Sequence, residues 1–251
     1  MSRTGDSQTM AYLNMFAVLG TLQELCREAH GETAEILTNK KPVSIVLSVK
    51  DGPSATYTFD KGFCTVVPGI KKKYHMKIPF RSCQSFNHMI NGLIWPISLK
   101  KVSHINAPLK NFTRLTELLR FYLKEAPEDN EVSARLLFYA AVSAISQVGN
   151  WDPVGRSSAS HIPDGTVMLS VKGGPKAAIT VQDHILTTIK AQPETPKAIM
   201  EFADPFLFRK LFSGQENFSA CIGTGEISVY GMLPMINKIK RILSRSADYL
   251  I

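Results

Sequence analysis

The strongest constraint on the fold is an internal repeat. The segment LSVKDGPSATYTF begins at Leu47 and LSVKGGPKAAITV begins at Leu169, 122 residues later, and eight of their thirteen positions are identical. About one match would be expected by chance at ordinary composition. The same offset continues without gaps as far as Gly92 and Gly214. A repeat of this length is the size of a domain and too long for a solenoid unit, so we expect two similar units.

The boundary between the two units is expected in the polar segment KEAPEDNE. This segment contains Pro127, and its acidic residues precede a new helical pattern. The expected domains are therefore residues 1–128 and residues 129–251. We interpret the repeat as a tandem duplication.

The composition is that of a globular chain that needs no disulfides. Apolar residues make up 44% and charged residues 20% of the 251 positions. The four cysteines form no CxxC pair and have no histidines at metal-finger spacing, which indicates free thiols in a reducing compartment. The first residues lack the basic start and the cleavage site of a signal peptide. No apolar stretch reaches the length needed to span a bilayer, so we expect a cytoplasmic protein.

The formal charge of +8 favours anionic partners, although a solvated basic surface is the ordinary alternative. The run GIKKKYHMK at residues 69–77 is basic and contains one tyrosine. Short lysine runs in turns are common, so nucleic-acid binding is not expected. A transient contact with an anionic membrane surface is favoured over nucleic-acid binding, because the last helical pattern is also basic, but a solvated basic surface is the leading interpretation.

Each copy shows the same order of expected elements. A helix opens the copy, and in the second copy it covers residues 130–149 with Gly149 as its stop. Two strands around a glycine-proline turn follow, then a third strand and a helix that ends at Gly92 or Gly214. In the second copy, residues 219–234 are expected to form a pair of short strands containing Ile222, Ile227 and Val229. A closing helix with one apolar face covers residues 235–251.

The second copy resembles a known family. The segment from Asp204 to Leu243 has a phenylalanine and a leucine before a glycine, then an alanine, a glycine-strand-glycine element and a short apolar closing helix. This pattern resembles the sterol carrier protein type-two (sterol-binding) domain family, and the resemblance covers nearly all of residues 130–251. The first copy lacks both glycines of the glycine-strand-glycine element, so we regard it as a degenerate repeat. The matching positions are Phe208, Leu211, Gly214, Ala220, Gly225, Ile227, Val229 and Gly231.

The resemblance implies an α+β fold made of two tandem sterol-carrier-like modules. Each module would be a mostly antiparallel five-stranded sheet covered by helices, with an apolar tunnel between the sheet and the helices. Domains of this family resemble non-enzymatic carriers of fatty acids, sterols and other lipids. The partner implied here is therefore an apolar small molecule, held without a cofactor.

The candidate ligand site lies in the second copy, between the sheet and two apolar helical stripes. Methionine suits a cavity that adapts to varied apolar shapes. The glycines at 223, 225 and 231 are expected to thin the opposing sheet and leave room for a ligand. The candidate ligand-binding residues are Phe208, Leu211, Phe212, Ile222, Gly225, Ile227, Val229, Met232, Met235, Ile236 and Ile239.

No catalytic or metal-binding motif is present in the sequence. There is no G-x-S-x-G nucleophile elbow, and no histidine pair has zinc-ligand spacing. Ser158, His161 and Asp164 lie close together in GRSSASHIPD, but triads assemble from distant segments, so a polar loop is the better interpretation. We therefore expect no enzyme activity and no bound metal. A structural or interaction module with filled cavities, forming an intramolecular pseudo-dimer, is the alternative to lipid carriage, and a lipid-ester hydrolase is a third hypothesis.

Overall fold

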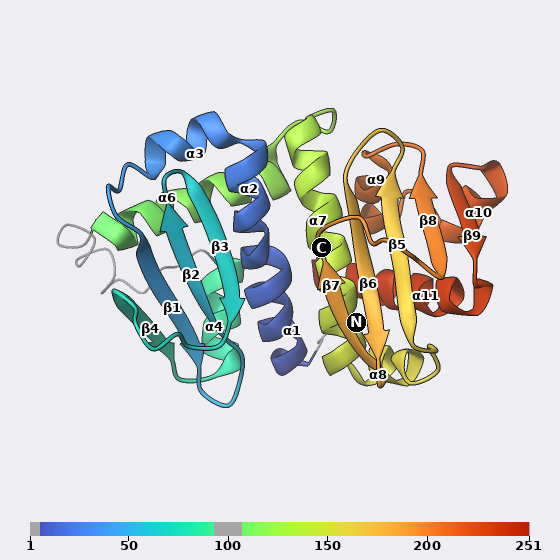
Figure 1. Cartoon of the computed structure of the whole chain (residues 1–251), viewed down its shortest axis with the longest axis horizontal. Coiled ribbons are helices and arrows are strands. Elements are labelled where there is room, and N and C mark those ends of the chain that lie inside the picture. The colour runs from blue at the N-terminus through green and yellow to red at the C-terminus, as the bar shows by residue number, and fades with distance from the viewer. Residues whose placement is uncertain (1–5, 93–106, 251) are drawn as a thin grey trace. The chain divides into compact units, whose positions relative to one another are not determined.

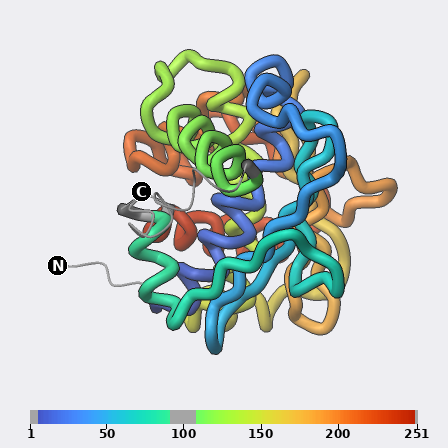
Figure 2. The backbone as a smooth tube through the Cα atoms, turned by 90° about the vertical axis from the view of Figure 1, so that its left-hand side faces the viewer, coloured from blue at the N-terminus to red at the C-terminus, as the bar shows by residue number. Residues whose placement is uncertain are grey.

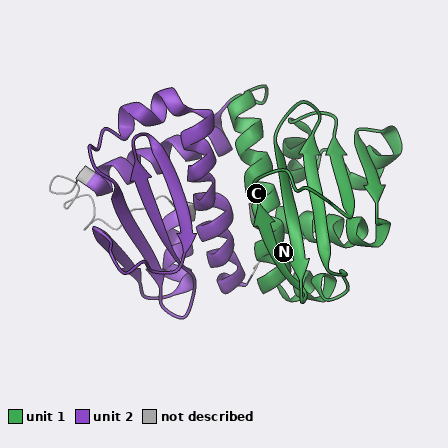
Figure 3. Ribbon diagram, in the orientation of Figure 1, with its two compact units in different colours: residues 1–5, 127–251 green, residues 6–126 purple. Residues whose placement is uncertain are grey.

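The computed structural model describes residues 6–92 and 107–250. The chain divides into two compact units, coloured separately in Figure 3. In chain order, the first unit comprises Asp6–Ala126 (purple, unit 2 in the figure key), and the second unit comprises the described residues from Pro127 onward (green, unit 1 in the key).

The first unit opens with a succession of short helical segments and then forms a sheet with two further helices (Figure 1). Its helical segments are α1 (Ser7–Leu13), the π-helix η1 (Asn14–Val18), the 3-10 turn η2 (Leu19–Thr21), α2 (Leu22–Glu28), α3 (His30–Ile36), α4 (Cys83–Gly92), α6 (Ala107–Arg120) and the π-helix η3 (Phe121–Glu125). Its strands are β1 (Val43–Val49), β2 (Ser54–Asp60), β3 (Phe63–Pro68) and β4 (Met76–Phe80).

The second unit opens with one long helix and has a sheet of five strands. Its helices are α7 (Glu131–Trp151), α8 (Pro153–Ala159), α9 (Leu207–Ser213), α10 (Phe218–Thr224) and α11 (Leu233–Leu250). Its strands are β5 (Gly165–Val171), β6 (Lys176–Gln182), β7 (Ile185–Ile189), β8 (Ala198–Phe202) and β9 (Ile227–Gly231).

Both sheets are mixed. The strand order is β3-β2-β1-β4 in the first unit and β7-β6-β5-β8-β9 in the second, and the β1–β4 and β5–β8 pairs are parallel. The α+β class is confirmed, and the second sheet has the expected five strands. The first sheet has four strands among the described residues, and the segment expected to supply its fifth strand lies in residues 93–106, outside them.

The two sheets have the same register at the 122-residue offset. Leu47 pairs with Ala55, as Leu169 pairs with Ala177. The hydroxyls of Ser44 and Thr58 lie 3.1 Å apart, and those at the matching positions 166 and 180 lie 3.2 Å apart. The turns agree as well, because the N–H of residue 52 or 174 donates to the carbonyl three residues earlier. The repeated residues therefore make the same hydrogen bonds in both units.

Helices cover one face of each sheet. In the first unit, α4 and α6 lie on one side of the strands, as the views of Figures 1 and 2 agree. Tyr57 and Phe59 point toward that side and contact the ring of Phe112 on α6. In the second unit, α7, α9 and α11 lie behind the strands in Figure 1. The helix-facing residues of each hairpin therefore form the core against these helices.

Three expectations about the second unit are corrected. Helix α7 runs past Gly149 to Trp151, because the small residue packs against Leu186 of β7 and does not end the helix. Residues 219–234 do not form two strands, since α10 precedes the single strand β9. By length and composition α7 could span a membrane, contrary to the sequence-based expectation, but 78% of its most apolar window is buried, as in the core helix of a folded domain.

Candidate functional site

The apolar layer of the second unit is built around an aromatic cluster. The ring of Phe208 on α9 lies 4.4 Å from that of Phe202 on β8 and 5.2 Å from that of Phe138 on α7. Phe212, one turn further along α9, lies 6.4 Å from Phe208. The cluster joins the sheet to two helices, and edge-on and tilted ring contacts of this kind add stability beyond area burial.

Most of the predicted ligand-binding residues lie in this layer. The buried members face the sheet or the neighbouring helices, as their apolar spacing predicted. They are Phe208, Leu211, Phe212, Ile227, Met235, Ile236 and Ile239. Ile222 and Val229 are half-buried, and Met232 and Gly225 are exposed. The structure therefore groups seven of the eleven residues in the interior and leaves four at or near the surface.

The glycines do not thin the sheet as expected. Gly223 lies inside α10, and Gly225 ends that helix with a φ of +83° and no atom within 4 Å of an added Cβ. Gly231 is the last residue of β9, where a Cβ would approach the Lys197 carbonyl oxygen to 2.3 Å. These glycines serve a helix end and a close backbone approach. The sequence argument that assigned them to a cavity wall was wrong.

The local sequence explains how α9 and α10 are placed. The Asp204 side chain accepts a hydrogen bond of 2.7 Å from the N–H of Phe206 at the start of α9, and Gly214 ends the helix with a φ of +76°. Asn217 then caps α10, because its side chain accepts hydrogen bonds from the N–H groups of residues 219 and 220. These local hydrogen bonds and the glycine stop therefore fix where the two short helices begin and end between β8 and β9.

A buried ionic network in the same unit links the start of α8 to α11. Asp152 is 1% exposed and caps α8 by accepting the Gly155 N–H at 2.8 Å. It also accepts the Tyr249 hydroxyl at 2.6 Å and the Arg245 guanidinium at 3.0 Å, both from α11. Burial alone would raise the pKa of Asp152, but the hydrogen bonds from Arg245, Tyr249 and Gly155 outweigh it and lower the pKa.

An open pocket of about 580 Å³ lies beside this network, between α7, α8 and the β6–β7 turn. One of its lining residues is Gly149, where an added Cβ would lie 2.7 Å from Leu186 Cδ2 and 3.6 Å from Ile242 Cδ1 of α11. The sequence patterns did not indicate this pocket, because its walls come from two segments more than twenty residues apart in the chain. The lining residues are Gly149, Asn150, Pro153, Arg156, Ser157, Ser160, Asp183, His184 and Ile185.

The serine, histidine and aspartate beside the pocket do not form a catalytic relay, and the expected polar loop is corrected, because residues 153–159 form helix α8. His161 Nδ1 lies 2.7 Å from the Ser157 carbonyl oxygen and 3.2 Å from Ser160 Oγ. The carboxylate of Asp164 accepts the Asp183 N–H at 3.0 Å. Ser158 is buried, and its hydroxyl has no hydrogen-bond partner among the described residues. These contacts place the serine, histidine and aspartate in separate interactions.

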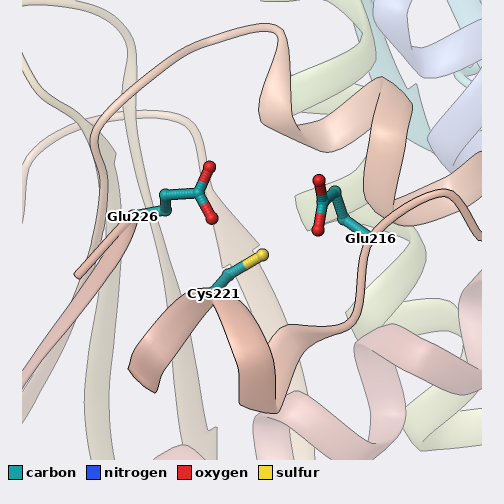
Figure 4. Close-up of side chains that lie close together, drawn as sticks. All are labelled: Glu216, Cys221 and Glu226. Carbon is teal, nitrogen blue, oxygen red and sulfur yellow. The ribbon is translucent and has the colours of Figure 1, made fainter. Parts of the chain in front are cut away.

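Three side chains near α10 could hold a metal ion. One ligand atom each from Glu216, Cys221 and Glu226 lies within 4.8 Å of the others (Figure 4). Burial raises the pKa of the Cys221 thiol, and its hydrogen bond to Glu226 raises it further. A metal such as zinc binds the thiolate, so it would have to displace this proton. Their five-residue spacing matches no metal motif, so sequence patterns gave no signal for the cluster.

No protein-family model matches this chain, and no curated protein matches it either. Solved structures are similar to parts of it. A UbiJ-SCP2 ubiquinone synthesis protein is 14% identical with a TM-score of 0.34, over 42% of this chain and 94% of its own. The sterol carrier protein domain 2 of Helicoverpa armigera is 14% identical with a TM-score of 0.37, over 44% and 88%. The sec-alkylsulfatase Pisa1 from Pseudomonas sp. is 13% identical with a TM-score of 0.27, over 62% of this chain and 31% of its own.

Proposed function

We propose that the second unit binds an apolar small molecule, such as a fatty acid or sterol, between its sheet and helices α7, α9 and α11. The observation that carries the proposal is the continuous apolar layer in which α9 and α11 present their stripes to the same sheet. Met235, Ile236 and Ile239 of α11 and Phe208 of α9 are all buried in it. Ligand sites for lipids are lined by apolar and aromatic side chains with few polar groups.

The open pocket supports a route into this layer. Gly149 lines the pocket, and the buried side chains of Leu186 and Ile242 lie close to it. We propose that displacement of the Leu186 side chain connects the pocket to the apolar interior. We propose the pocket as the place where the apolar ligand enters.

A filled-core interaction module is the second candidate, and the aromatic cluster favours it. The rings of Phe138, Phe202, Phe208 and Phe212 contact one another directly. Protein interiors packed in this way have few voids larger than a water molecule. In this candidate the second unit stabilises the chain and presents surfaces, and it binds no ligand.

A pair of matched substitutions distinguishes the two candidates. Phe208 and Phe86 occupy equivalent positions at the 122-residue offset, and both are buried. Phe208→Trp adds bulk inside the proposed site, whereas Phe86→Trp adds the same bulk to the first unit. Overpacking of this kind costs about 1–3 kcal/mol in either unit, so circular dichroism first verifies that both variants are folded.

The measured quantity is the affinity of the full chain for a fluorescent long-chain fatty acid and a fluorescent sterol. We expect Phe208→Trp to weaken binding about tenfold or more and Phe86→Trp to leave it unchanged. Equal effects of the two substitutions would move the site out of the second unit. Absence of binding by the unsubstituted chain would favour the filled-core module.

We further propose that the chain arose by tandem duplication and has no catalytic activity of its own. The shared register and turn hydrogen bonds at one fixed offset support the duplication. The separate contacts of Ser158, His161 and Asp164 support the absence of a hydrolytic triad. A cytoplasmic location is supported by four free cysteines, three of which are buried.

A further inference from the structure

The connection between β3 and β4 crosses the helix-free face of the first sheet. Both of its ends are tied to that sheet. The Gly69 N–H donates to the Ser54 carbonyl at 2.8 Å, and the buried Thr56 hydroxyl donates to the Gly69 carbonyl at 2.9 Å. At the other end the His75 N–H donates to the Ser44 carbonyl at 2.9 Å, and the Ser44 N–H returns a bond to the imidazole. The loop from Gly69 to His75, here called the crossover loop, is therefore anchored and not free to swing away.

The crossover loop concentrates positive charge on this face. Lys71, Lys72 and Lys73 are consecutive and exposed, and Lys77 of β4 points to the same side of the sheet, since its neighbour Ile78 is buried on the helix side. None of these four lysines forms an ion pair with another described residue. The described strands and the loops between them contain two acidic residues in this unit, Asp51 in the β1–β2 turn and Asp60 at the end of β2.

Exposed apolar side chains surround the lysines. Ile70 is 47% exposed and Tyr74 is 44% exposed, one on each side of the lysine run. Val67, on the adjoining edge strand β3, is 38% exposed. Large apolar side chains interleaved with cations are typical of segments that lie in the boundary between lipid headgroups and acyl chains. Single exposed apolar residues are common on any surface, but three around one cationic run form a patch.

The second unit contains the same crossover without the lysine run and without its two flanking apolar residues, although Ile189, at the position that matches Val67, is 43% exposed. Its Lys197 N–H donates to the Thr166 carbonyl at 2.8 Å, as the matching His75 N–H does to Ser44. At the 122-residue offset, the segment IKKKY at 70–74 corresponds to QPETP at 192–196. The same connection is therefore made with two different sets of side chains in the two units. The cations and exposed apolar groups of the first unit are not required for the connection itself.

We propose that the crossover loop of the first unit, with Val67 and Lys77, docks on an anionic lipid surface. The lysines would lie at the headgroups while Ile70 and Tyr74 enter the interface. The chemistry favours a membrane over a nucleic acid for two reasons. The patch contains lysines and no arginine, and an exposed isoleucine has no role in base stacking or phosphate contact. The proposal holds whether or not the second unit binds a ligand.

The chain supplies its own matched control for a test. Replacing residues 70–74 with QPETP, the sequence of the second crossover, removes three cations and both flanking apolar side chains and introduces one glutamate. A second variant, K71Q/K72Q/K73Q, removes the charge alone. A third, K238Q/K240Q/R241Q on α11, removes the same number of charges from another surface. The binding of each full chain to vesicles of phosphatidylcholine, with and without phosphatidylserine, is measured by co-sedimentation.

We expect the unsubstituted chain to bind vesicles that contain phosphatidylserine, to bind them more weakly as the salt concentration is raised, and not to bind neutral vesicles. Each lysine near an anionic leaflet strengthens binding about fivefold. The QPETP and K71Q/K72Q/K73Q variants should therefore bind about 100-fold more weakly, and the α11 variant should bind nearly as well as the unsubstituted chain. Unchanged fatty-acid affinity in the loop variants would show that the second unit is intact.

Three results would overturn the proposal. The unsubstituted chain could fail to bind anionic vesicles, or the QPETP variant could bind them as well as the unsubstituted chain does. The α11 variant could lose as much affinity as the loop variants, which would indicate a response to net charge alone. Loop-dependent binding of a single-stranded oligonucleotide, without vesicle binding, would assign the patch to nucleic acid instead.

Discussion

The ionic network at Asp152 gives the sharpest prediction of stability. The Asp152 carboxylate satisfies an N–H at the start of α8 and two groups of α11, Arg245 and Tyr249. Asp152→Ala removes the helix cap and leaves the guanidinium and the hydroxyl without their buried acceptor. Because α7, α8 and α11 all meet at this residue, the substitution is expected to weaken the whole second unit.

The magnitude follows from the contacts. Loss of an N-cap costs about 1 kcal/mol, and breaking a buried ion pair costs about 3–5 kcal/mol. The Arg245 side chain is 33% exposed, so solvent screens part of the second term. We therefore expect a loss of about 3 kcal/mol in the free energy of unfolding. For a unit of this size that corresponds to a fall of about 12 °C in Tm.

Differential scanning calorimetry of the full chain measures this loss. The control is Glu131→Gln, which removes an exposed ion pair of the same unit, Glu131 to Arg135 at 3.7 Å, and should change stability by about 0.5 kcal/mol or less. The second-unit transition should fall in the Asp152 variant and stay nearly constant in the control. If Asp152→Ala lowers the transition no more than Glu131→Gln does, the network is not stabilising and the argument fails.

Three further predictions concern acid, backbone geometry and thiol chemistry. The pKa of Asp152 is lowered on folding, so the ionised carboxylate contributes its full stabilisation of the folded state above the ordinary pKa of about 4, and this contribution is lost as the pH falls through the lowered pKa. Urea unfolding at a series of acidic pH values should show this loss of stability for the native chain and a smaller loss for Asp152→Asn. Gly231→Ala should destabilise the second unit by more than about 1 kcal/mol, because φ at Gly231 is +84° and the added Cβ would meet the Lys197 carbonyl. Gly223→Ala in α10 should instead be neutral or stabilising by up to about 1 kcal/mol. Equal denaturation midpoints for the two variants would contradict this. Burial raises the pKa of both Cys221 and Cys83, but Cys221 is buried whereas Cys83 is partly exposed, so iodoacetamide at neutral pH should label Cys221 more slowly. Peptide mass spectrometry measures the two rates, and faster labelling of Cys221 would refute the burial argument.

Sequence periodicity predicted the elements that are determined by residues close together in the chain. The two hairpins, the glycine stop of α9 and the buried face of α11 follow from local turn residues and apolar spacing. Helix α10 was missed because its short apolar run and flanking glycines resemble a strand, although Asn217 offered a capping signal. The expected roles of Gly223 and Gly225 failed for the same reason.

The parts of the site that sequence patterns could not supply depend on long-range contacts. Asp152 and Arg245 are 93 residues apart, and no local pattern links them. The pocket beside α8 likewise joins α7 to the β6–β7 turn, where Asp183 and His184 both have positive φ. Conversely, the basic run at 69–77 was visible in the sequence. Its place on an anchored loop became apparent only from the hydrogen bonds of Thr56 and Ser44.

Native mass spectrometry of the purified full chain tests the central claim most directly. If the second unit carries an apolar ligand, the spectrum should contain the chain with a noncovalent addition of lipid mass, and gentle activation should release it. Phe208→Trp should reduce the occupied fraction, whereas Phe86→Trp should not. A bare chain mass that stays unchanged after incubation with long-chain fatty acids and sterols would contradict the claim.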